Sequence, residues 1–224
     1  MEKDSIFRGM TVTLLLILIN VWCFIAISPL NLIYFAFQPI AFLEGKRIWT
    51  LITYMFVHGN FWHLLINMVA LFNFGVFEKI LGGKRYLCFY LVSGILAGFV
   101  PVLLSYLILV YLLGNVSSEF MVVIVRIFGH PLGLYIGASG AIFGIAGLIT
   151  VLWPRIRMVI IIFPFFSMPA YQMIPFVLFG MFLIPLFFNA PIGNAVHLGG
   201  FLCGAAYGLY LRYRYGGEIQ NGRC

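Results

Sequence analysis

Ser139 and His197 are the two side chains of this sequence whose types best suit nucleophilic catalysis. A serine hydroxyl becomes a nucleophile when an adjacent imidazole takes its proton, and the imidazole then returns that proton to the leaving amine. A Ser-His-Asp triad is excluded, because the only aspartate is Asp4, in a predicted cytoplasmic tail. If the chain is a hydrolase, it therefore uses a Ser-His dyad.

Two further polar side chains could stabilise the oxyanion of a tetrahedral intermediate. His63 and Asn67 lie one helical turn apart on the same face, so both can point at one site. Backbone N–H groups at the start of a helix beginning at Ser139 are additional donors, and the helix dipole there has the favourable sign. We therefore expect the catalytic residues to be Ser139, His197, Asn67 and His63.

A metal centre is the competing chemistry, because three histidines are expected at one depth in the membrane. The sequence contains no HExxH pattern, and the spacing of His58 and His63 does not place both imidazoles squarely on one helical face. We expect neither a metal ion nor another cofactor.

The elements that must position these residues are apolar helices. The chain is 63% hydrophobic and only 8% charged, whereas soluble domains carry roughly 25% charged residues. Its apolar blocks of about 20 residues match the length that a helix needs to cross a bilayer. The sequence predicts an all-α polytopic membrane protein, a single membrane domain over 1–224 with six transmembrane helices. The predicted ranges are about 10–28, 56–77, 86–113, 139–153, 158–187 and 195–212.

Two other apolar stretches, 31–43 and 120–128, are too short to cross a bilayer. The second of them also contains Arg126. We expect both stretches to be interfacial or re-entrant segments.

The basic residues indicate an orientation in the membrane. The net charge is +7, but Lys and Arg occur singly or in pairs at the ends of the apolar blocks, so we expect no nucleic-acid partner. With both termini cytoplasmic, ten of the thirteen lie inside, as the positive-inside rule predicts for a multi-pass protein of the cell membrane. These ten are Lys3, Arg8, Lys79, Lys84, Arg85, Arg155, Arg157, Arg212, Arg214 and Arg223.

Glycines indicate how two of these helices could approach closely. His197, Gly200, Gly204 and Gly208 share one helical face, and the helix that begins at Ser139 also has a glycine face. Small residues let helix backbones come together in lipid, so pairing these two helices would bring Ser139 towards His197.

These motifs resemble those of the rhomboid proteases over about residues 49–208. The GASG of residues 137–140 resembles the G-x-S-G motif of the family. The run HGNFWHLLIN of residues 58–67 resembles its H-x₄-H-x₃-N motif. His197 and the glycines that follow it resemble the sixth helix of the family. The resemblance implies a six-helix fold, an outward-opening aqueous cavity and a first loop partly in the membrane. It implies a serine endopeptidase that cleaves single-span membrane proteins near the outer face of the lipid bilayer.

By position in these motifs, the resemblance gives each site residue a role. Ser139 is the nucleophile, His197 the base, and His63 and Asn67 the oxyanion donors, whereas His58 takes a more structural role.

Three features depart from the family pattern. Phe143 stands where a tyrosine commonly stacks on the catalytic histidine, and it keeps the ring but lacks the hydroxyl. Thr50 follows Trp49 where arginine is common, with Arg47 two residues before Trp49. The segment 114–136 is longer than a minimal third loop.

Two other classes of function compete with proteolysis. A non-catalytic rhomboid-like scaffold would bind transmembrane clients, but such proteins typically lack the Ser or the His that this chain retains. A channel or small transporter could relay protons through histidines, but it predicts inverted repeats, and the second half of the chain does not resemble the first.

Overall fold

The computed structural model describes residues 9–112, 118–130, 132–160, 163–188 and 192–220, and they are mostly helical. The longer helices are α1 (Thr11–Ala26), α4 (Phe61–Phe74), α6 (Gly83–Leu107), α7 (Ser118–Phe128), α8 (Ser139–Leu152), α9 (Ala170–Phe187) and α10 (Asn194–Gln220). The shorter ones are η1 (Pro29–Tyr34), α2 (Pro39–Leu43), α3 (Thr50–Thr53), η2 (Tyr54–Phe56), α5 (Val76–Leu81) and a π-helical turn, η3 (Ile108–Leu112). Two strands, β1 (Arg157–Ile160) and β2 (Phe163–Pro169), complete the described elements.

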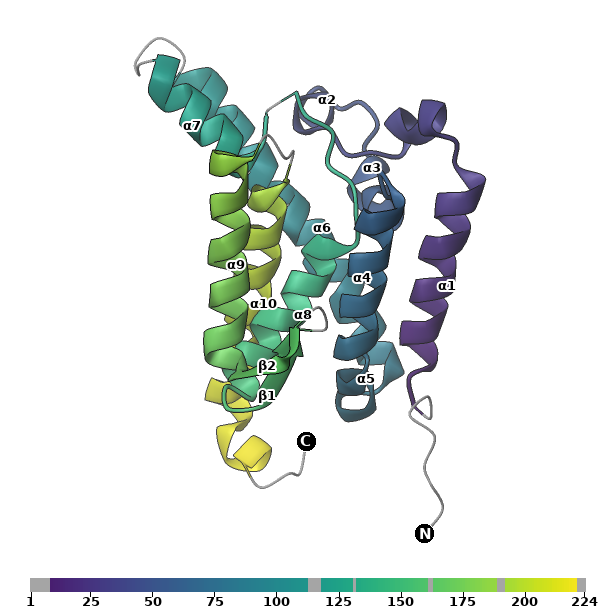
Figure 1. The fold of residues 1–224 in the computed structure, drawn as a ribbon, viewed down its shortest axis with the longest axis vertical. Coiled ribbons are helices and arrows are strands. Elements are labelled where there is room, and N and C mark those ends of the chain that lie inside the picture. The colour runs from purple at the N-terminus through teal and green to yellow at the C-terminus, as the bar shows by residue number, and fades with distance from the viewer. Residues whose placement is uncertain (1–8, 113–117, 131, 161–162, 189–191, 221–224) are drawn as a thin grey trace.

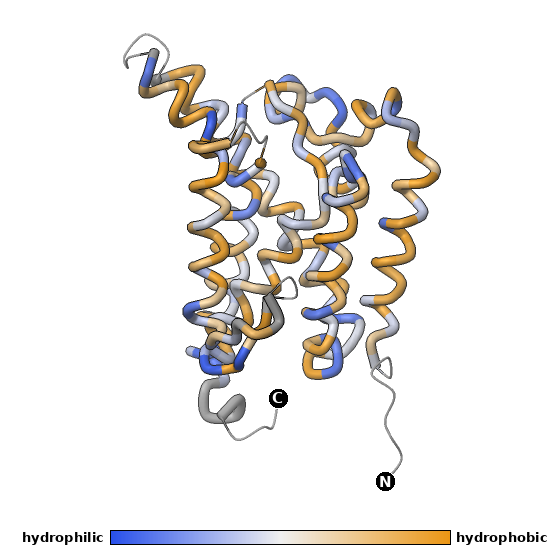
Figure 2. The backbone as a smooth tube through the Cα atoms, viewed as in Figure 1, coloured by the Kyte–Doolittle hydropathy of each residue, from blue (hydrophilic) through white to orange (hydrophobic). Residues whose placement is uncertain are grey.

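Helix α8 lies at the centre of the fold and contacts α4, α6, α9 and α10 (Figure 1). Most of its residues, from Gly140 to Ile149, are buried. Apolar residues line the helices, and hydrophilic ones collect towards the two ends (Figure 2). Within the described residues, three helical stretches are long and apolar enough to cross a membrane: Phe61–Leu81, Gly83–Val110 and Ala170–Phe187. Helices α1 and α8 are apolar but shorter.

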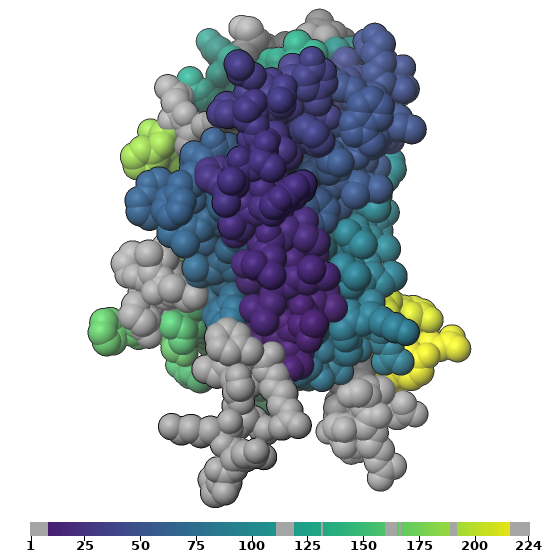
Figure 3. Space-filling view, turned by 90° about the vertical axis from the view of Figure 1, so that its right-hand side faces the viewer, coloured from purple at the N-terminus to yellow at the C-terminus, as the bar shows by residue number. Residues whose placement is uncertain are grey.

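Helix α1 is fixed to the rest of the fold by a buried carboxylate. Glu78, in α5, accepts hydrogen bonds from the backbone N–H groups of Val12 and Thr13 and from the Thr13 hydroxyl. The first N–H groups of a helix have no partner within it, so Glu78 caps α1 from another element. The helix then covers the face of the molecule shown in Figure 3.

The pairing predicted from the glycines is present between α8 and α10. A Cβ added at Gly200 would meet the carbonyl oxygen of Gly140, and one added at Gly204 would meet that of Gly144. These contacts join backbone to backbone, with no side chain between the two helices. Only glycine permits this approach, so the Ser139 end of α8 lies beside the His197 end of α10.

Helix α4 begins later than predicted. The 3₁₀ turn η2 and an extended Val57 occupy the start of the range 56–77, and Asn60 then caps α4 by accepting a hydrogen bond from the His63 N–H at 2.9 Å. His63 therefore lies in the first turn of α4, with Asn67 one turn later.

The prediction of a single helix over 158–187 is wrong in its first part, although the described residues are mostly helical as expected. The strands β1 (157–160) and β2 (163–169) pair antiparallel, with Arg157 opposite Pro169, and the helix begins at Ala170. A helix through this run would lose intrahelical hydrogen bonds at Pro164 and Pro169, because proline has no N–H. The run is also rich in β-branched and aromatic residues, which favour strands.

The other helices lie close to their predicted ranges. Helix α1 falls within 10–28, α6 with η3 starts three residues before 86 and reaches Leu112, and α8 starts at Ser139. Helix α10 starts at Asn194 but continues to Gln220, past the predicted end at 212, with a kink at Tyr215. The predicted last residue of the third range, 113, lies outside the described residues. The short stretch 31–43 contains α2 and the later part of η1, and 120–128 falls within α7.

We predict that Gly204→Val destabilises the protein more than the matched change Gly180→Val in α9. A Cβ at Gly204 would overlap the backbone of α8, whereas a Cβ at Gly180 has nothing within 4 Å. Overpacking typically costs about 1–3 kcal/mol, and a backbone carbonyl cannot rotate out of the way, so we expect the upper end of that range. Thermal unfolding in detergent measures the difference. Equal melting temperatures for the two variants would contradict the backbone contact.

Candidate active site

The structure brings Ser139 and His197 together. Ser139 is the first residue of α8, and His197 lies in the first turn of α10. The Ser139 Oγ and the His197 Nε2 are 2.8 Å apart, within hydrogen-bond distance. His197 is only 7% exposed, and Ser139 is half-buried. The geometry suits proton transfer from the hydroxyl to the imidazole.

The imidazole is held by packing. The Phe143 ring, one helical turn after Ser139, lies against the His197 ring with centroids 5.0 Å apart and planes inclined by 36°. The ring contact expected from Phe143 is therefore present without the hydroxyl of a tyrosine. The Nδ1 of His197 is buried and has no hydrogen-bond partner among the described residues, so no described carboxylate orients the ring.

The chain enters α8 through a conformation that requires glycine. Gly137 has φ +110, and a Cβ there would lie 2.6 Å from the His63 Nε2. Its N–H donates to the Tyr54 carbonyl at 2.8 Å. The backbone just before Ser139 therefore packs against the His63 ring on one side and is hydrogen-bonded to η2 on the other.

His63 and Asn67 both lie beside this backbone. The Asn67 Nδ2 would be 3.8 Å from a Cβ at Gly137, and Asn67 is 5% exposed. The amide donates one hydrogen bond, of 2.8 Å, to the His63 carbonyl in its own helix, and its second N–H remains for another acceptor. The four predicted site residues thus come from three helices and meet at one place.

His58 supports the same backbone. It is buried, and its Nε2 accepts a long hydrogen bond, 3.4 Å, from the Ala138 N–H. Its ring also meets the His63 ring edge to face, with centroids 5.0 Å apart. These contacts fit the structural role expected for His58. In the part of the chain that the structure describes, no group of three or more His, Cys, Asp or Glu side chains could hold a metal ion.

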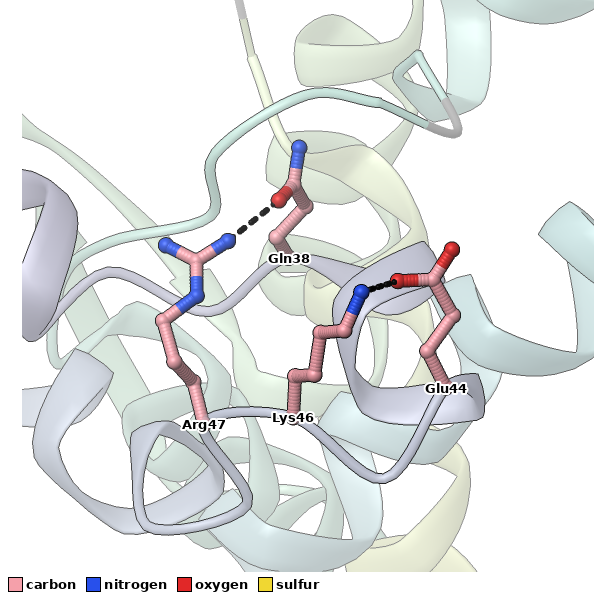
Figure 4. Close-up of polar contacts among 4 residues, drawn as sticks. All are labelled: Gln38, Glu44, Lys46 and Arg47. Atoms are coloured by element: carbon pink, nitrogen blue, oxygen red, sulfur yellow. Dashed lines mark hydrogen bonds and ion pairs between the residues drawn. The ribbon is translucent and has the colours of Figure 1, made fainter.

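The first loop carries its own hydrogen-bond network, part of which is drawn in Figure 4. Arg47 donates to the Gln38 Oε1 at 2.5 Å and to the Ile33 carbonyl at 2.9 Å, and the Trp49 indole donates to the Tyr34 carbonyl. Arg47, which has φ +49, lies two residues before Trp49, and its guanidinium bonds to the earlier part of the first loop.

This network continues to the segment that precedes Ser139. Gln38 donates through its Nε2 to the Leu132 carbonyl, and Phe37 and Tyr135 exchange backbone hydrogen bonds of 2.9 and 2.7 Å. The first loop is therefore hydrogen-bonded to the segment that leads to Ser139.

Tyr54 is a site-supporting residue that sequence reasoning missed. It is 1% exposed, and its hydroxyl donates to the Gly94 carbonyl at 2.6 Å while its carbonyl anchors Gly137. The sequence does place this tyrosine, with its polar hydroxyl, within an apolar run four residues before His58, and that could have pointed to it.

Comparisons with known proteins place the chain in a family. Residues 45–214 match the Rhomboid domain model. The chain is 28% identical to Rhomboid protein 1, mitochondrial, of Saccharomyces cerevisiae over 165 residues, which are 70% of this chain and 40% of that protein. It is 28% identical to RHOMBOID-like protein 5 of Arabidopsis thaliana (77% and 47%) and 25% identical to Rhomboid-like protease 3 of Toxoplasma gondii (78% and 54%).

The aligned parts thus span about half the length of these relatives. The family model, in contrast, covers most of this chain and contains all four predicted site residues. Together with its apolar helices, this match shows that the chain is a multi-pass membrane protein that belongs to the rhomboid family.

Proposed function

We propose that this chain is an intramembrane serine endopeptidase that uses Ser139 as nucleophile and His197 as base. The observation that carries the proposal is the 2.8 Å distance between Ser139 Oγ and His197 Nε2, at the ends of two helices in backbone contact. Membership of the rhomboid family, which includes named proteases, adds support.

The first half of the reaction forms an acyl-enzyme. The Nε2 of His197 takes the hydroxyl proton while the Ser139 Oγ attacks the carbonyl carbon of the scissile peptide bond. The tetrahedral intermediate then collapses, its C–N bond breaks, and His197 returns the proton to the departing amine. The C-terminal part of the substrate leaves, and its N-terminal part remains esterified to Ser139.

The second half uses water. His197 removes a proton from a water molecule, whose oxygen attacks the ester carbonyl, and the proton then passes to the Ser139 Oγ as the carboxylic acid leaves. Both tetrahedral intermediates carry an oxyanion. The first backbone N–H groups of α8, the Asn67 amide and the His63 ring are its donors in this proposal, and the position of both side chains beside Gly137 supports their role.

We also propose that residues 1–224 form one membrane domain with six spans: α1, α4 with α5, α6, α8, α9 and α10. The start of α1 and the last part of α10 lie at the same end of the molecule, which supports termini on one side, the cytoplasmic side (Figure 1). The site residues lie towards the opposite end of their helices, so the substrates would be single-span proteins of the cell membrane, cut near its outer face.

Replacing Ser139 or His197 with Ala should abolish cleavage of a single-span substrate in liposomes. The two residues act in one step, so the double variant should be no worse than either single variant. The matched control is Ser105→Ala, which removes a buried hydroxyl from α6 and should cleave like the wild type. Substantial cleavage by Ser139→Ala would refute the mechanism. Binding of substrate by wild type without any cleavage would favour the scaffold instead.

Asn67→Ala and His63→Ala should each lower kcat by about 10²–10³-fold, the usual effect of losing one oxyanion donor. The KM should change little, because the donors act mainly in the transition state. Steady-state kinetics in detergent measure both constants. Asn73→Ala, at an exposed position of the same helix, is the matched control and should keep the wild-type kcat. Unchanged kcat in both site variants would exclude them from the oxyanion site.

A further inference from the structure

Asn194 joins three helices at the start of α10. It is fully buried, and its Nδ2 donates hydrogen bonds of 2.9 Å to the Ile127 carbonyl of α7 and of 2.9 Å to the Met181 carbonyl of α9. Its Oδ1 has no hydrogen-bond partner among the described residues. The amide therefore acts in the described structure as a donor to two other helices.

Both acceptors are carbonyls that their own helices cannot satisfy. In α9 the residue four places after Met181 is Pro185, which has no N–H to donate. Ile127 lies in the last turn of α7, which ends at Phe128, so its carbonyl has no partner within that helix. An unpaired carbonyl inside a membrane protein is costly. Asn194 donates hydrogen bonds to both of these carbonyls, and this gives α10 a fixed point on α7 and α9.

This fixed point lies one helical turn before His197. Because no described group bonds the His197 Nδ1, the position of the ring depends on the α10 backbone and on the Phe143 ring. The neighbouring Gly193 packs on the Tyr135 ring, since a Cβ there would lie 2.9 Å from it. The N-terminal turn of α10 is therefore held on several sides.

We propose that Asn194 is the positioning residue for His197, and that it sets the distance from the imidazole to Ser139 by anchoring α10 on carbonyls of α7 and α9 that have no partner in their own helices. The proposal rests on the proposed function of the dyad. It also gives a structural role to α7, in the long segment before Ser139, because the last turn of α7 braces α10.

The first test compares Asn194→Ala with the matched control Asn20→Ala. Asn20 is also fully buried, and its amide also donates to a carbonyl, that of Leu16, but it lies in α1. Both variants should melt at lower temperature than the wild type. Only Asn194→Ala should lower kcat per folded molecule, by about 10–10²-fold with little change in KM, because misplacing a reacting group by about 1 Å has effects of that order.

A second readout reports on the dyad without a peptide substrate. The rate at which a fluorophosphonate labels Ser139 measures how well His197 activates the hydroxyl, and it should fall in Asn194→Ala and stay unchanged in Asn20→Ala. A purely structural role for Asn194 would lower the melting temperature and leave both kcat and the labelling rate of the folded protein unchanged. That result would overturn the proposal.

A double-mutant cycle of Pro185 and Asn194 tests the anchoring on α9. Pro185→Ala restores an N–H that can bond the Met181 carbonyl within α9. In that background, Asn194→Ala should lower the labelling rate less than it does in the wild-type background, whereas equal losses in both backgrounds would contradict the anchoring. Should Asn194→Ala not fold, Asn194→Gln, which keeps the amide on a longer side chain, takes its place with the same expected direction.

Failure of the proposed function would look different. A wild type that cleaves nothing would reject the protease, and a Ser139→Ala variant that still cleaves would reject Ser139 as the nucleophile. In either case the labelling comparison still decides the role of Asn194. A wild type in which Ser139 is not labelled at all would reject both.

Discussion

The contact between the backbones of α8 and α10 is the constraint on which the rest of this structure depends. Lipid offers helices little hydrophobic driving force to associate, so close packing must come from shape. Here Gly200 and Gly204 allow α10 to touch the carbonyls of Gly140 and Gly144 directly. A helix rises about 1.5 Å per residue, so the register of this contact sets the distance between the Ser139 hydroxyl and the His197 ring at the helix ends.

The elements around this contact act on the two reactive groups from opposite sides. The first loop and η2 hold the backbone before Ser139 through the Phe37–Tyr135 bridge and the hydrogen bond from Gly137 to Tyr54. On the other side, Phe143 faces the His197 ring. Among the described residues no carboxylate takes part in this support. Orientation of the dyad therefore comes from rings and backbone hydrogen bonds, which unlike a surface ion pair are little affected by salt.

The sequence predicted which side chains lie close together more accurately than it predicted the bounds of the elements. Helical periodicity and membrane depth were sufficient to place His63 and Asn67 beside Ser139, because both rules are geometric. The pairing of β1 with β2 was missed because hydropathy alone does not distinguish an apolar strand pair from an apolar helix. Asn194 was missed because its role depends on hydrogen bonds to carbonyls of α7 and α9, which come near it only when the chain has folded.

The glycine contact also has a genetic consequence. When an enlarged residue meets a side chain, a smaller neighbour can compensate: a Cβ at Gly94 would meet the flexible Met55 side chain, so a second-site suppressor could arise there. At Gly204 the obstacle is the main chain of α8, and no amino-acid substitution makes a carbonyl smaller. A defect at Gly204 should therefore be recovered only by reversion to glycine, whereas suppressors of a defect at Gly94 can map to a different helix.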